Sequence, residues 1–578
     1  MAFVSLREFL GRLGLATPAQ FDEWSKAWRV AAESGSQETL LGFICRERGL
    51  AEDVFLQQLA TALNWPYLDL PKVSVPAEVR NRISTKVAFQ HSVLPTQAVE
   101  GVLQVVVSNP FDTAMLNAVR FDARGPVQFA LATRVEIEKA LKKYYGVGAE
   151  TLDEMSGDDP LELLVGEDKE ITEGDQEASV IKFVNQIIWE AFKDRATDIH
   201  FEPAEDELRI RYRIDGILHQ TPMPPQLKRF QASLISRIKV MSGMNISEKR
   251  LPQDGRINVR IKGEEIDIRV STVPTVYGES VSLRLLTRGK IFLSLDKLGF
   301  APLEENAIRE IIIKPHGIFL VTGPTGSGKS TSLYAFLSTI NSIQKRIITI
   351  EEPVEYELKG INQIAVRPDI GLTFAMGLRH ILRQDPNVIM VGEIRDLETA
   401  EIAIRAALTG HLVFSTLHTN DAPSAFTRLI DMGIEPFLVA SSVEAVMAQR
   451  LVRTICPHCK VEQKVEAAYL RRIGFPEDEI PTAKFWKGAG CEQCRQLGYQ
   501  GRMGIYELLI LNESLRPLIL NRSSSSTIAQ RAMDQGMRTL RTDGWNKVRN
   551  ASTTIEEVLR VTQIEEHLDA LSQEGKKP

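Results

Sequence analysis

The chain has 578 residues, of which 43% are hydrophobic and 25% charged, and its formal net charge is -6. This length predicts three or four domains, each large enough to bury a core. The acidic balance argues against a dedicated nucleic-acid-binding protein. We find no run of about 20 apolar residues that could cross a bilayer, and charges break up the apolar N-terminus, so we expect neither a membrane span nor a signal peptide.

Residues 1–148 are expected to form an N-terminal docking or regulatory module, either helical or α/β. The last helix of this module has the clearest signals. Thr133 is a helix N-cap residue, Glu136 follows three positions later as in a capping box, and Gly146 ends the helix. The apolar stripe between them, expected to lie in the core, consists of Ile137, Ala140, Leu141, Tyr144 and Tyr145.

An acidic stretch separates this module from the rest of the chain. Residues 150–178 contain twelve aspartates and glutamates against one lysine. Because like charges repel and aromatic residues are scarce, we expect residues 149–178 to be a flexible linker. The following residues, 179–290, are expected to form a smaller α+β domain. Within it, residues 256–271 alternate in polarity on both sides of Lys262-Gly263, which predicts a β-hairpin.

The same alternation predicts where two arginines of this domain lie. Around Arg269, the residues Ile266, Ile268 and Val270 fall on the opposite face of the strand, and around Arg284 the residues Val281, Leu283 and Leu285 do. Both arginines should therefore lie on polar faces, outside the core. By itself this pattern favours a solvated sheet surface with an Asp267–Arg269 pair.

Residues 291–578 read as strand–loop–helix repeats, which are typical of an α/β domain with a largely parallel sheet. Between an apolar strand and a helix lies a Gly-x-x-x-x-Gly-Lys-Ser pattern, whose alternative reading is a plain glycine-rich turn. In a phosphate-binding loop the backbone N–H groups surround the phosphates, Lys329 neutralises their charge and Ser330 ligates magnesium. The nucleotide-binding residues are Gly323, Pro324, Thr325, Gly326, Ser327, Gly328, Lys329, Ser330 and Thr331.

Three further strands of this domain end in polar residues. Ile347–Ile350 is followed by Glu351 and Glu352, Val388–Val391 by Gly392 and Glu393, and Leu412–Phe414 by a segment that contains His418. Ligands of open α/β sheets bind at the carboxyl ends of strands, so these groups should converge on the phosphates. Hydrolysis requires a group that acts on water, and Glu351 and Glu393 are the carboxylate candidates. For His411 and His418, the alternative to a role in the nucleotide site is a purely structural one.

Four of the five cysteines form two Cys-x-x-Cys pairs. Cys456 and Cys459 are separated by 31 residues from Cys491 and Cys494. Two such pairs can close a tetrahedral zinc site, and we expect a zinc subdomain at about 450–505 with a helical excursion such as Ala467–Ile473 inside it. Unliganded or redox-active pairs are the alternative. Metal binding in a reducing cytoplasm explains this pattern better than disulfides do.

Over residues 178–565 the motifs resemble those of the ATPases of type II secretion and type IV pilus assembly. IITIEEPVEYE (347–357) is similar to the family's acidic box, RQDPNVIMVGEIRD (383–396) to its Walker B region, and TGHLVFSTLHTNDA (409–422) to its histidine box. ATDIHFEP, RYRIDG, RLPQDGR and DIRVSTVPTVYGE are similar to motifs of the domain that precedes the ATPase core. The four cysteines support the same resemblance, because assembly-type motors of the family commonly carry such a zinc site.

The resemblance implies a RecA-like P-loop ATPase core in a homo-hexamer that uses ATP, magnesium and zinc. It implies that Glu351, Glu393 and His418 are catalytic, and that Arg269 and Arg284 reach the γ-phosphate bound to a neighbouring subunit. The implied partners are an inner-membrane platform protein and the cytoplasmic domain of a further assembly protein. The chain would then be cytoplasmic and peripherally attached to the inner membrane through them.

The sequence departs from the usual motifs in two respects. Glu352 stands where an aspartate is usual, which leaves Glu351 as the better match for the catalytic carboxylate. Gly392 precedes Glu393, so the aspartate that binds magnesium in many P-loop enzymes is absent, a feature that the family shares.

The N-terminal segments 11–24 and 40–70 resemble, with irregular spacing, the paired helical motifs of domains that in some relatives bind cyclic di-GMP. Docking to a membrane partner is the alternative role of this module.

Two other functions remain open from the sequence. One is a nucleic-acid motor of the conjugation or packaging type. The basic residues near the cysteines favour it, namely Arg450, Arg453, Lys460, Arg471 and Arg472, whereas the net charge and the lack of basic-aromatic patches disfavour it. The other is a nucleotide-binding scaffold that does not hydrolyse ATP. The sequence does not distinguish a pilus from a secretion pseudopilus as the object of assembly.

Overall fold

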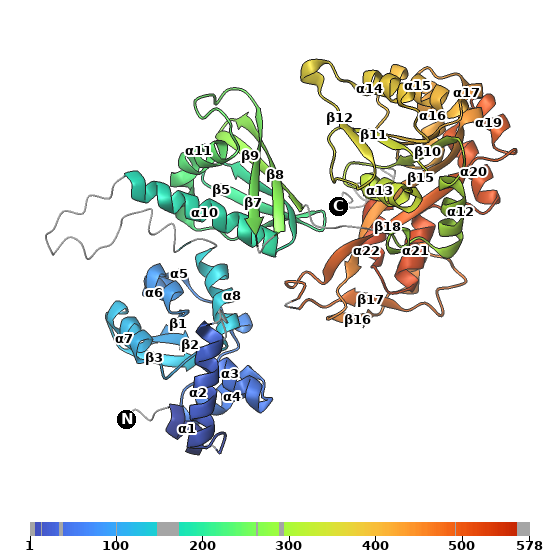
Figure 1. Ribbon diagram of the computed structural model, residues 1–578. Coiled ribbons are helices and arrows are strands. Elements are labelled where there is room, and N and C mark those ends of the chain that lie inside the picture. Colours follow the sequence, from blue (N-terminus) through green and yellow to red (C-terminus); the bar gives the residue numbers. More distant parts are fainter. Residues whose placement is uncertain are drawn as a thin grey trace, which may run out of the picture. The chain divides into compact units, whose positions relative to one another are not determined.

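The computed structural model describes residues 6–12, 14–33, 39–99, 101–146, 149, 173–261, 264–287, 294–491 and 493–562. It consists of two compact units, Met1–Thr287 and Arg288–Pro578, here named unit 1 and unit 2. In Figure 1 the colours follow the chain, so that unit 1 runs from blue to green and unit 2 continues to red. Among the described helices, none is long and apolar enough to span a membrane.

The first part of unit 1 is a mixed helical and β module with a hydrophobic core of its own. Its sheet has the order β1-β2-β3, in which β1 and β2 are antiparallel and β2 and β3 parallel. The elements are α1 (Leu6–Arg12), α2 (Pro18–Glu33), α3 (Leu40–Arg48), α4 (Glu52–Leu63), α5 (Ala77–Arg80), α6 (Thr85–Gln90), β1 (Leu94–Val99), β2 (Val102–Val107), α7 (Thr113–Asp122), β3 (Val127–Leu131) and α8 (Arg134–Tyr145).

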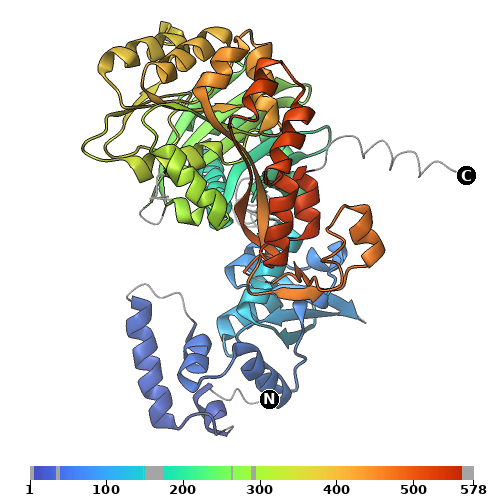
Figure 2. The same cartoon turned by 90° about the vertical axis from the view of Figure 1, so that its right-hand side faces the viewer.

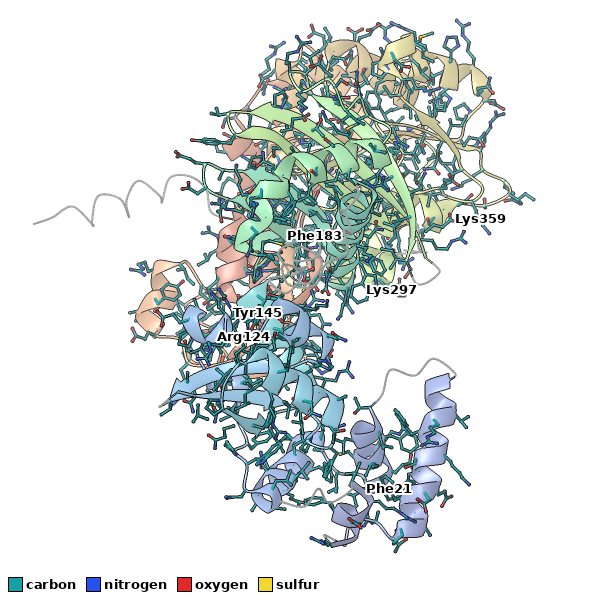
Figure 3. The ribbon with its side chains drawn as sticks, turned by 90° about the vertical axis from the view of Figure 1, so that its left-hand side faces the viewer. Phe21, Arg124, Tyr145, Phe183, Lys297 and Lys359 are labelled. Atoms are coloured by element: carbon teal, nitrogen blue, oxygen red, sulfur yellow. The ribbon has the colours of Figure 1, made fainter. Side chains whose placement is uncertain are left out.

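Helix α8 begins and ends where the sequence predicts. Thr133 Oγ1 accepts a hydrogen bond from the Glu136 N–H at 3.3 Å, which satisfies one of the unpaired amides at the helix start. Gly146 ends the helix. Within the predicted stripe Tyr145, which is labelled in Figure 3, is buried and Tyr144 is partly buried, and both pack in the core of this module, so the core prediction is confirmed.

The second part of unit 1 is a six-stranded sheet with the order β6-β5-β4-β9-β8-β7, and all neighbouring strands are antiparallel. Helices α10 and α11 contribute to one core with the apolar face of this sheet, and Phe183 of α10 is fully buried there (Figure 3). The elements are α10 (Glu173–Lys193), β4 (Ala196–Pro203), β5 (Leu208–Ile214), β6 (Ile217–Gln220), α11 (Gln231–Met241), β7 (Gln253–Ile261), β8 (Glu264–Thr275) and β9 (Gly278–Thr287).

The predicted hairpin exists, because β7 and β8 are antiparallel and Ile261 is paired with Glu264. Its turn, Lys262-Gly263, lies outside the described residues. The linker prediction of 149–178 is wrong at its end, since α10 already begins at Glu173. Most of the remaining linker, residues 150–172, lies outside the described residues.

Unit 2 is built on a seven-stranded sheet with the order β12-β11-β13-β14-β10-β15-β18. All pairs are parallel except β15 with β18, and the strands β10, β13 and β14 are buried along their whole length. Such continuous apolar strands occur where helices cover both faces of a parallel sheet. Two separate cores confirm this layering, one with α14–α17, α19 and α20, the other with α12 and α13.

The elements of this α/β part are α12 (Pro302–Ile312), β10 (Gly317–Thr322), α13 (Lys329–Ile340), β11 (Ile347–Glu351), β12 (Asn362–Ala365), α14 (Phe374–Ile381), β13 (Val388–Val391), α15 (Leu397–Leu408), β14 (Leu412–Leu417), α16 (Pro423–Asp431), α17 (Pro436–Ser442), β15 (Val443–Ile455), β18 (Tyr499–Ile510), α19 (Arg516–Leu520) and α20 (Ser525–Asp534). These bounds agree with the strands and the helix that the sequence predicts around the phosphate-binding loop.

A small lobe lies between β15 and β18. It consists of the two-stranded sheet β16 (Lys460–Gln463) and β17 (Phe485–Gly488) and of α18 (Ala467–Arg472), which is the predicted helical excursion. The C-terminal helices α21 (Leu540–Arg549) and α22 (Ile555–Thr562), red in Figure 2, pack along β18 and β15. Apolar residues of the lobe, such as Phe475, share a core with Trp545 of α21.

Candidate active site and metal centre

The phosphate-binding loop joins β10 to α13 and lies directly on β15. Gly323 and Gly328 both have positive φ angles, 147° and 91°. A Cβ atom on Gly323 would lie 2.6 Å from the Gln449 carbonyl oxygen, and one on Gly328 would lie 2.7 Å from Gln449 Nε2. Both positions therefore require glycine, because any side chain would push the loop off the strand.

This loop fits the phosphates of a nucleotide. Ser327 Oγ is buried and has no hydrogen-bond partner in the described part of the chain, and the first N–H groups of α13 have no carbonyl partner within the helix. Lys329 Nζ donates to Gly323 O at 2.8 Å and to Pro324 O at 3.2 Å. The exposed Ser330, in the first turn of α13, offers the hydroxyl that a magnesium ion would use.

The charge of Lys329 responds to its surroundings. Burial lowers the pKa of Lys329 to about 8, while the negative charge of Glu393 opposes this shift and the positive charge of Arg450 adds to it. Glu393 and Arg450 are thus close enough to act electrostatically on the lysine. The end of β13, the middle of β15 and the phosphate-binding loop meet at one place.

The strand ends bring Glu393 and His418 together, as the sequence predicts. His418 Nε2 lies 3.3 Å from Glu393 Oε2, and Arg395 Nη2 lies 2.5 Å from Glu393 Oε1. The Glu393 side chain is 12% exposed, so it reaches solvent at the edge of the sheet. Arg395 also donates to Glu352 Oε2 at 3.3 Å. Two carboxylates, a guanidinium and an imidazole therefore form one polar cluster next to Lys329.

Glu351 does not belong to this cluster. Its side chain is buried, and both carboxylate oxygens accept hydrogen bonds inside the protein. Tyr334 donates to Oε2, while Thr349 Oγ1 at 2.5 Å and Gln363 Nε2 at 3.0 Å donate to Oε1. A carboxylate held in this way joins β11 to α13 and β12, and the catalytic role of Glu351 stays a prediction.

The structure separates the two histidines. His411 Nδ1 lies 2.9 Å from the Ala406 carbonyl oxygen at the end of α15, which is a structural contact and separates it from His418.

Two arginines of the site were not predicted from the sequence. Sequence reasoning missed Arg395 and grouped Arg450 with the basic residues near the cysteines. Arg395 could have been found, because it follows Glu393 by two positions on a segment that leaves the sheet. Arg450 gave no local signal, since its role depends on the pairing of β15 with β10.

Arg269 and Arg284 lie on the polar face of the sheet in unit 1, as predicted. Arg284 Nε donates to Asp198 Oδ1 at 2.9 Å. Arg269 is directly paired with Arg284 on one side and with Arg256 on the other. Directly opposed side chains lie on the same face, so the three arginines form a row of like charges, which Asp198 continues beyond Arg284. A row of this kind suits an anionic ligand or partner.

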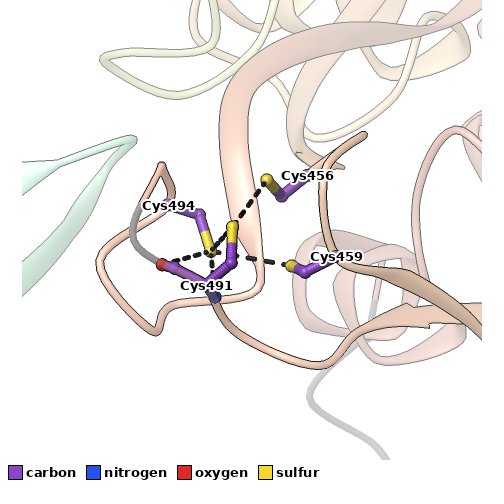
Figure 4. A group of neighbouring side chains, drawn as sticks. All are labelled: Cys456, Cys459, Cys491 and Cys494. Carbon is purple, nitrogen blue, oxygen red and sulfur yellow. Dashed lines mark hydrogen bonds between the residues drawn. The ribbon is translucent and has the colours of Figure 1, made fainter. Parts of the chain in front are cut away.

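The four cysteine sulfurs form a compact cluster (Figure 4). They all lie within 4.8 Å of one another, and the pairs Cys456–Cys491, Cys459–Cys494 and Cys491–Cys494 are each 3.7 Å apart. A tetrahedral zinc site with Zn–S bonds of about 2.3 Å has sulfur–sulfur distances of about 3.8 Å, whereas a disulfide has about 2 Å. The geometry therefore fits a four-thiolate metal site and excludes disulfides within the cluster.

One thiol of this cluster is already close to ionisation. The backbone N–H groups of Cys491 and Gly498 each lie 3.2 Å from Cys494 Sγ. Although burial by itself raises the pKa of Cys494, these hydrogen bonds lower it to about 7. Thiolates are the form that binds zinc, and Cys494 is the thiol nearest to this form, whereas burial raises the pKa of Cys456 and of Cys459.

Comparison with known proteins identifies two regions. The model of the family described as type II/IV secretion system protein matches residues 173–560, and that of the MshEN domain matches residues 63–151. The second region covers only the end of the N-terminal segments 11–24 and 40–70 that resemble the paired helical motifs.

Relatives of this chain are found in both kinds of system. It is 40% identical over 545 residues to the type IV pilus assembly ATPase PilB of Myxococcus xanthus, with 92% of this chain and 95% of that protein covered. It is 42% identical over 555 residues to the type II secretion system protein E of Xanthomonas campestris pv. campestris, with 93% and 95% covered. The type II secretion system protein E of Aeromonas hydrophila is 51% identical over 395 residues, which cover 68% of this chain and 78% of that protein.

Proposed function

The chain belongs to the family of type II/IV secretion system proteins, and from this premise we propose that its ATPase activity drives assembly of a type IV pilus or a type II secretion pseudopilus. It is an ATPase of this family. The observation that carries the mechanistic part of the proposal is the cluster of Glu393, His418 and Arg395 beside the phosphate-binding loop.

ATP with magnesium, when bound at this loop, would supply the phosphoryl group and the metal charge that stabilises the transition state. The loop's N–H groups and Lys329 would hold the phosphates, and Ser330 would ligate the metal. Glu393 is the group placed to accept a hydrogen bond from the attacking water. Arg395 and His418 hold the two oxygens of Glu393, so that the carboxylate keeps one orientation.

Arg269 and Arg284 are proposed to act on the nucleotide of a neighbouring subunit in a homo-hexamer. Their place on a polar sheet face and the row of like charges support this role. The proposed site of action is the cytoplasmic face of the inner membrane, reached through a platform protein and the cytoplasmic domain of a further assembly protein.

The experiment that tests the proposal compares phosphate release by the purified full chain and by its Lys329→Ala variant. We expect magnesium-dependent turnover in the first and none in the second. Equal background rates would favour a scaffold without hydrolysis. Stimulation by single- or double-stranded DNA, with salt-dependent binding, would favour a nucleic-acid motor instead. Restoration of pilus assembly or of secretion in a strain that lacks its own motor then identifies the system served.

The match to the MshEN domain model favours a second function, binding of cyclic di-GMP by the N-terminal module. Isothermal titration of the full chain with cyclic di-GMP, and with GTP as the control, tests this function. Saturable binding of the cyclic dinucleotide alone supports it. Absence of heat with both ligands leaves the module as a docking platform for a membrane partner.

A further inference from the structure

The loop that carries His418 is fixed to three strands. Thr322 Oγ1, at the end of β10, accepts a hydrogen bond from the Thr419 N–H at 2.8 Å. Glu507 Oε1, on β18, accepts one from the Ala422 N–H at 2.8 Å. Arg450, on β15, makes the third attachment through Asn420. An attachment therefore lies one, two and four residues after His418, which itself is exposed.

Arg450 is bonded to the His418 loop and adjoins the base of the phosphate-binding loop. Its Nη2 donates to the Asn420 carbonyl oxygen at 2.8 Å and lies 3.4 Å from Asn420 Oδ1. Its Nη1 donates to the Gln449 carbonyl oxygen at 3.0 Å and would lie 3.1 Å from a Cβ atom on Gly323. The same guanidinium is thus hydrogen-bonded to the loop of His418 and to Gln449 of β15, at the place where the base of the phosphate-binding loop lies against that strand.

Burial of a guanidinium on a strand in the middle of a sheet is unfavourable for the free energy of folding. Arg450 is 9% exposed, its nearest negative groups, Glu507 and Asp421, make no direct ion pair with it, and burial lowers its pKa. Apolar side chains of similar size often replace buried charges without loss of stability. Stability by itself therefore gives a weak reason for an arginine here, whereas the fixed fork of donors can hold the His418 loop at a set distance from β15, on which the phosphate-binding loop lies.

We propose that Arg450 is a positioning residue for ATP hydrolysis, which holds the His418 loop against the base of the phosphate-binding loop. The inference rests on the proposed role of Glu393 and His418. Because Glu393 Oε2 is 3.3 Å from His418 Nε2, a shift of the loop by about 1 Å removes this contact and costs on the order of 10²-fold in turnover. The hydrogen bonds to the phosphates come from other residues, so nucleotide affinity is retained.

The test uses the full chain with Arg450→Lys, which keeps the charge and loses the fork, and with Arg450→Gln. The matched control is Arg453→Gln, three positions along the same strand, whose guanidinium pairs with Glu557 away from the phosphate-binding loop. For the Arg450 variants we expect the Kd of a non-hydrolysable ATP analogue to stay within about threefold and kcat to fall by about 10²-fold. Arg453→Gln should keep its kcat per folded chain.

Two further measurements separate a positioning role from other roles. In a double-mutant cycle with His418→Ala, the Arg450→Lys change should cost little more once His418 is absent. Hydrogen exchange of the amides of Thr419 and Ala422 should become faster in Arg450→Lys and remain slow in Arg453→Gln. Additive losses in the cycle, an affinity loss with normal kcat, or unchanged exchange of these amides would each overturn the inference. Faster exchange combined with wild-type turnover of His418→Ala would instead overturn the proposed role of His418, while the attachment through Arg450 stands.

Discussion

His418 Nε2 lies 3.3 Å from Glu393 Oε2, at the point where β13 and β14 leave the sheet. The other oxygen of Glu393 is paired with Arg395. A carboxylate that is held on both oxygens but still reaches solvent is suited to orient a water molecule rather than to bind a phosphate. The phosphates have their own binding groups in the loop after β10.

Glu393→Gln should therefore separate binding from hydrolysis. We expect the Kd for ATP to change by less than about threefold and kcat to fall by about 10²- to 10⁴-fold, because the amide cannot take up a proton. Equilibrium binding and single-turnover phosphate release measure the two quantities. Glu401→Gln, on the exposed side of α15, is the matched control and should behave as wild type. Wild-type turnover of Glu393→Gln would remove this residue from the mechanism.

Glu351→Gln tests whether the adjacent strand contributes a second catalytic carboxylate. Because both oxygens of Glu351 accept hydrogen bonds from Tyr334, Thr349 and Gln363, the amide places one donor against another. We expect a loss of about 1–3 kcal/mol in the free energy of unfolding and a kcat within about threefold of wild type. Urea unfolding measures the free energy of unfolding, and phosphate release measures kcat. Normal stability with a large loss of kcat would restore the catalytic assignment.

Much of the site could be predicted from the sequence because its signals are local. The phosphate-binding loop is a contiguous pattern, and Glu393 and His418 each follow a short apolar strand. Parallel strands place such residues at one edge of a sheet, so their meeting follows from the pattern. The four cysteines have a spacing that admits few alternatives.

The remaining features depend on contacts between distant segments. Glu351 and Glu393 look alike in sequence, and only the burial of Glu351 beneath Tyr334 separates them. The position of Arg450 beside the phosphate-binding loop follows from the pairing of β15 with β10, which no residue of the strand encodes alone. The pairing of Arg284 with Asp198 joins residues 86 positions apart.

Zinc should be present at about one ion per chain, held by Cys456, Cys459, Cys491 and Cys494. The cluster ties β15 and β16 to the start of β18, so we expect Cys459→Ser to unfold the lobe and to leave the phosphate-binding loop folded. Elemental analysis of reduced protein measures the metal, and limited proteolysis measures the lobe. Cys45→Ser, in the N-terminal module, is the control and should keep the metal. Metal-free reduced protein with an intact lobe would contradict the assignment.

The packing of α22 should depend on pH. Burial by itself raises the pKa of Glu557, but hydrogen bonds from Arg560 and Arg453 outweigh burial and lower it from 4.5 to about 2. A carboxyl group with a lowered pKa stabilises the fold above pH 4.5, and this contribution is lost as the pH falls towards 2. The shift corresponds to about 3 kcal/mol. Hydrogen exchange of α22 between pH 7 and pH 3 measures this loss. Glu557→Gln should show faster exchange at pH 7 and a weaker pH dependence, and a wild-type profile in this variant would contradict the role.

For the arginine row in unit 1, the expected contribution to folding stability differs most from the expected contribution to the rate of ATP hydrolysis. Arg256, Arg269 and Arg284 are opposed in register, and like charges directly opposite one another destabilise a sheet. As surface charges they would therefore be dispensable. As groups that reach a neighbouring subunit's phosphate, each is worth about 10³- to 10⁵-fold in rate.

We expect Arg269→Ala to fold as well as wild type, to bind ATP and to lose nearly all turnover. Arg284→Ala should behave similarly, with a small loss of stability because Asp198 loses its partner. Arg260→Ala, a more exposed change on β7, is the control and should retain its activity. Because the arginine and the phosphate-binding loop would belong to different subunits, mixing Arg269→Ala with Lys329→Ala chains should restore part of the activity, since some interfaces then contain both intact halves. Assembled rings of Arg269→Ala that hydrolyse ATP at the wild-type rate, or mixtures that regain nothing, would mean that the row does not act across subunits.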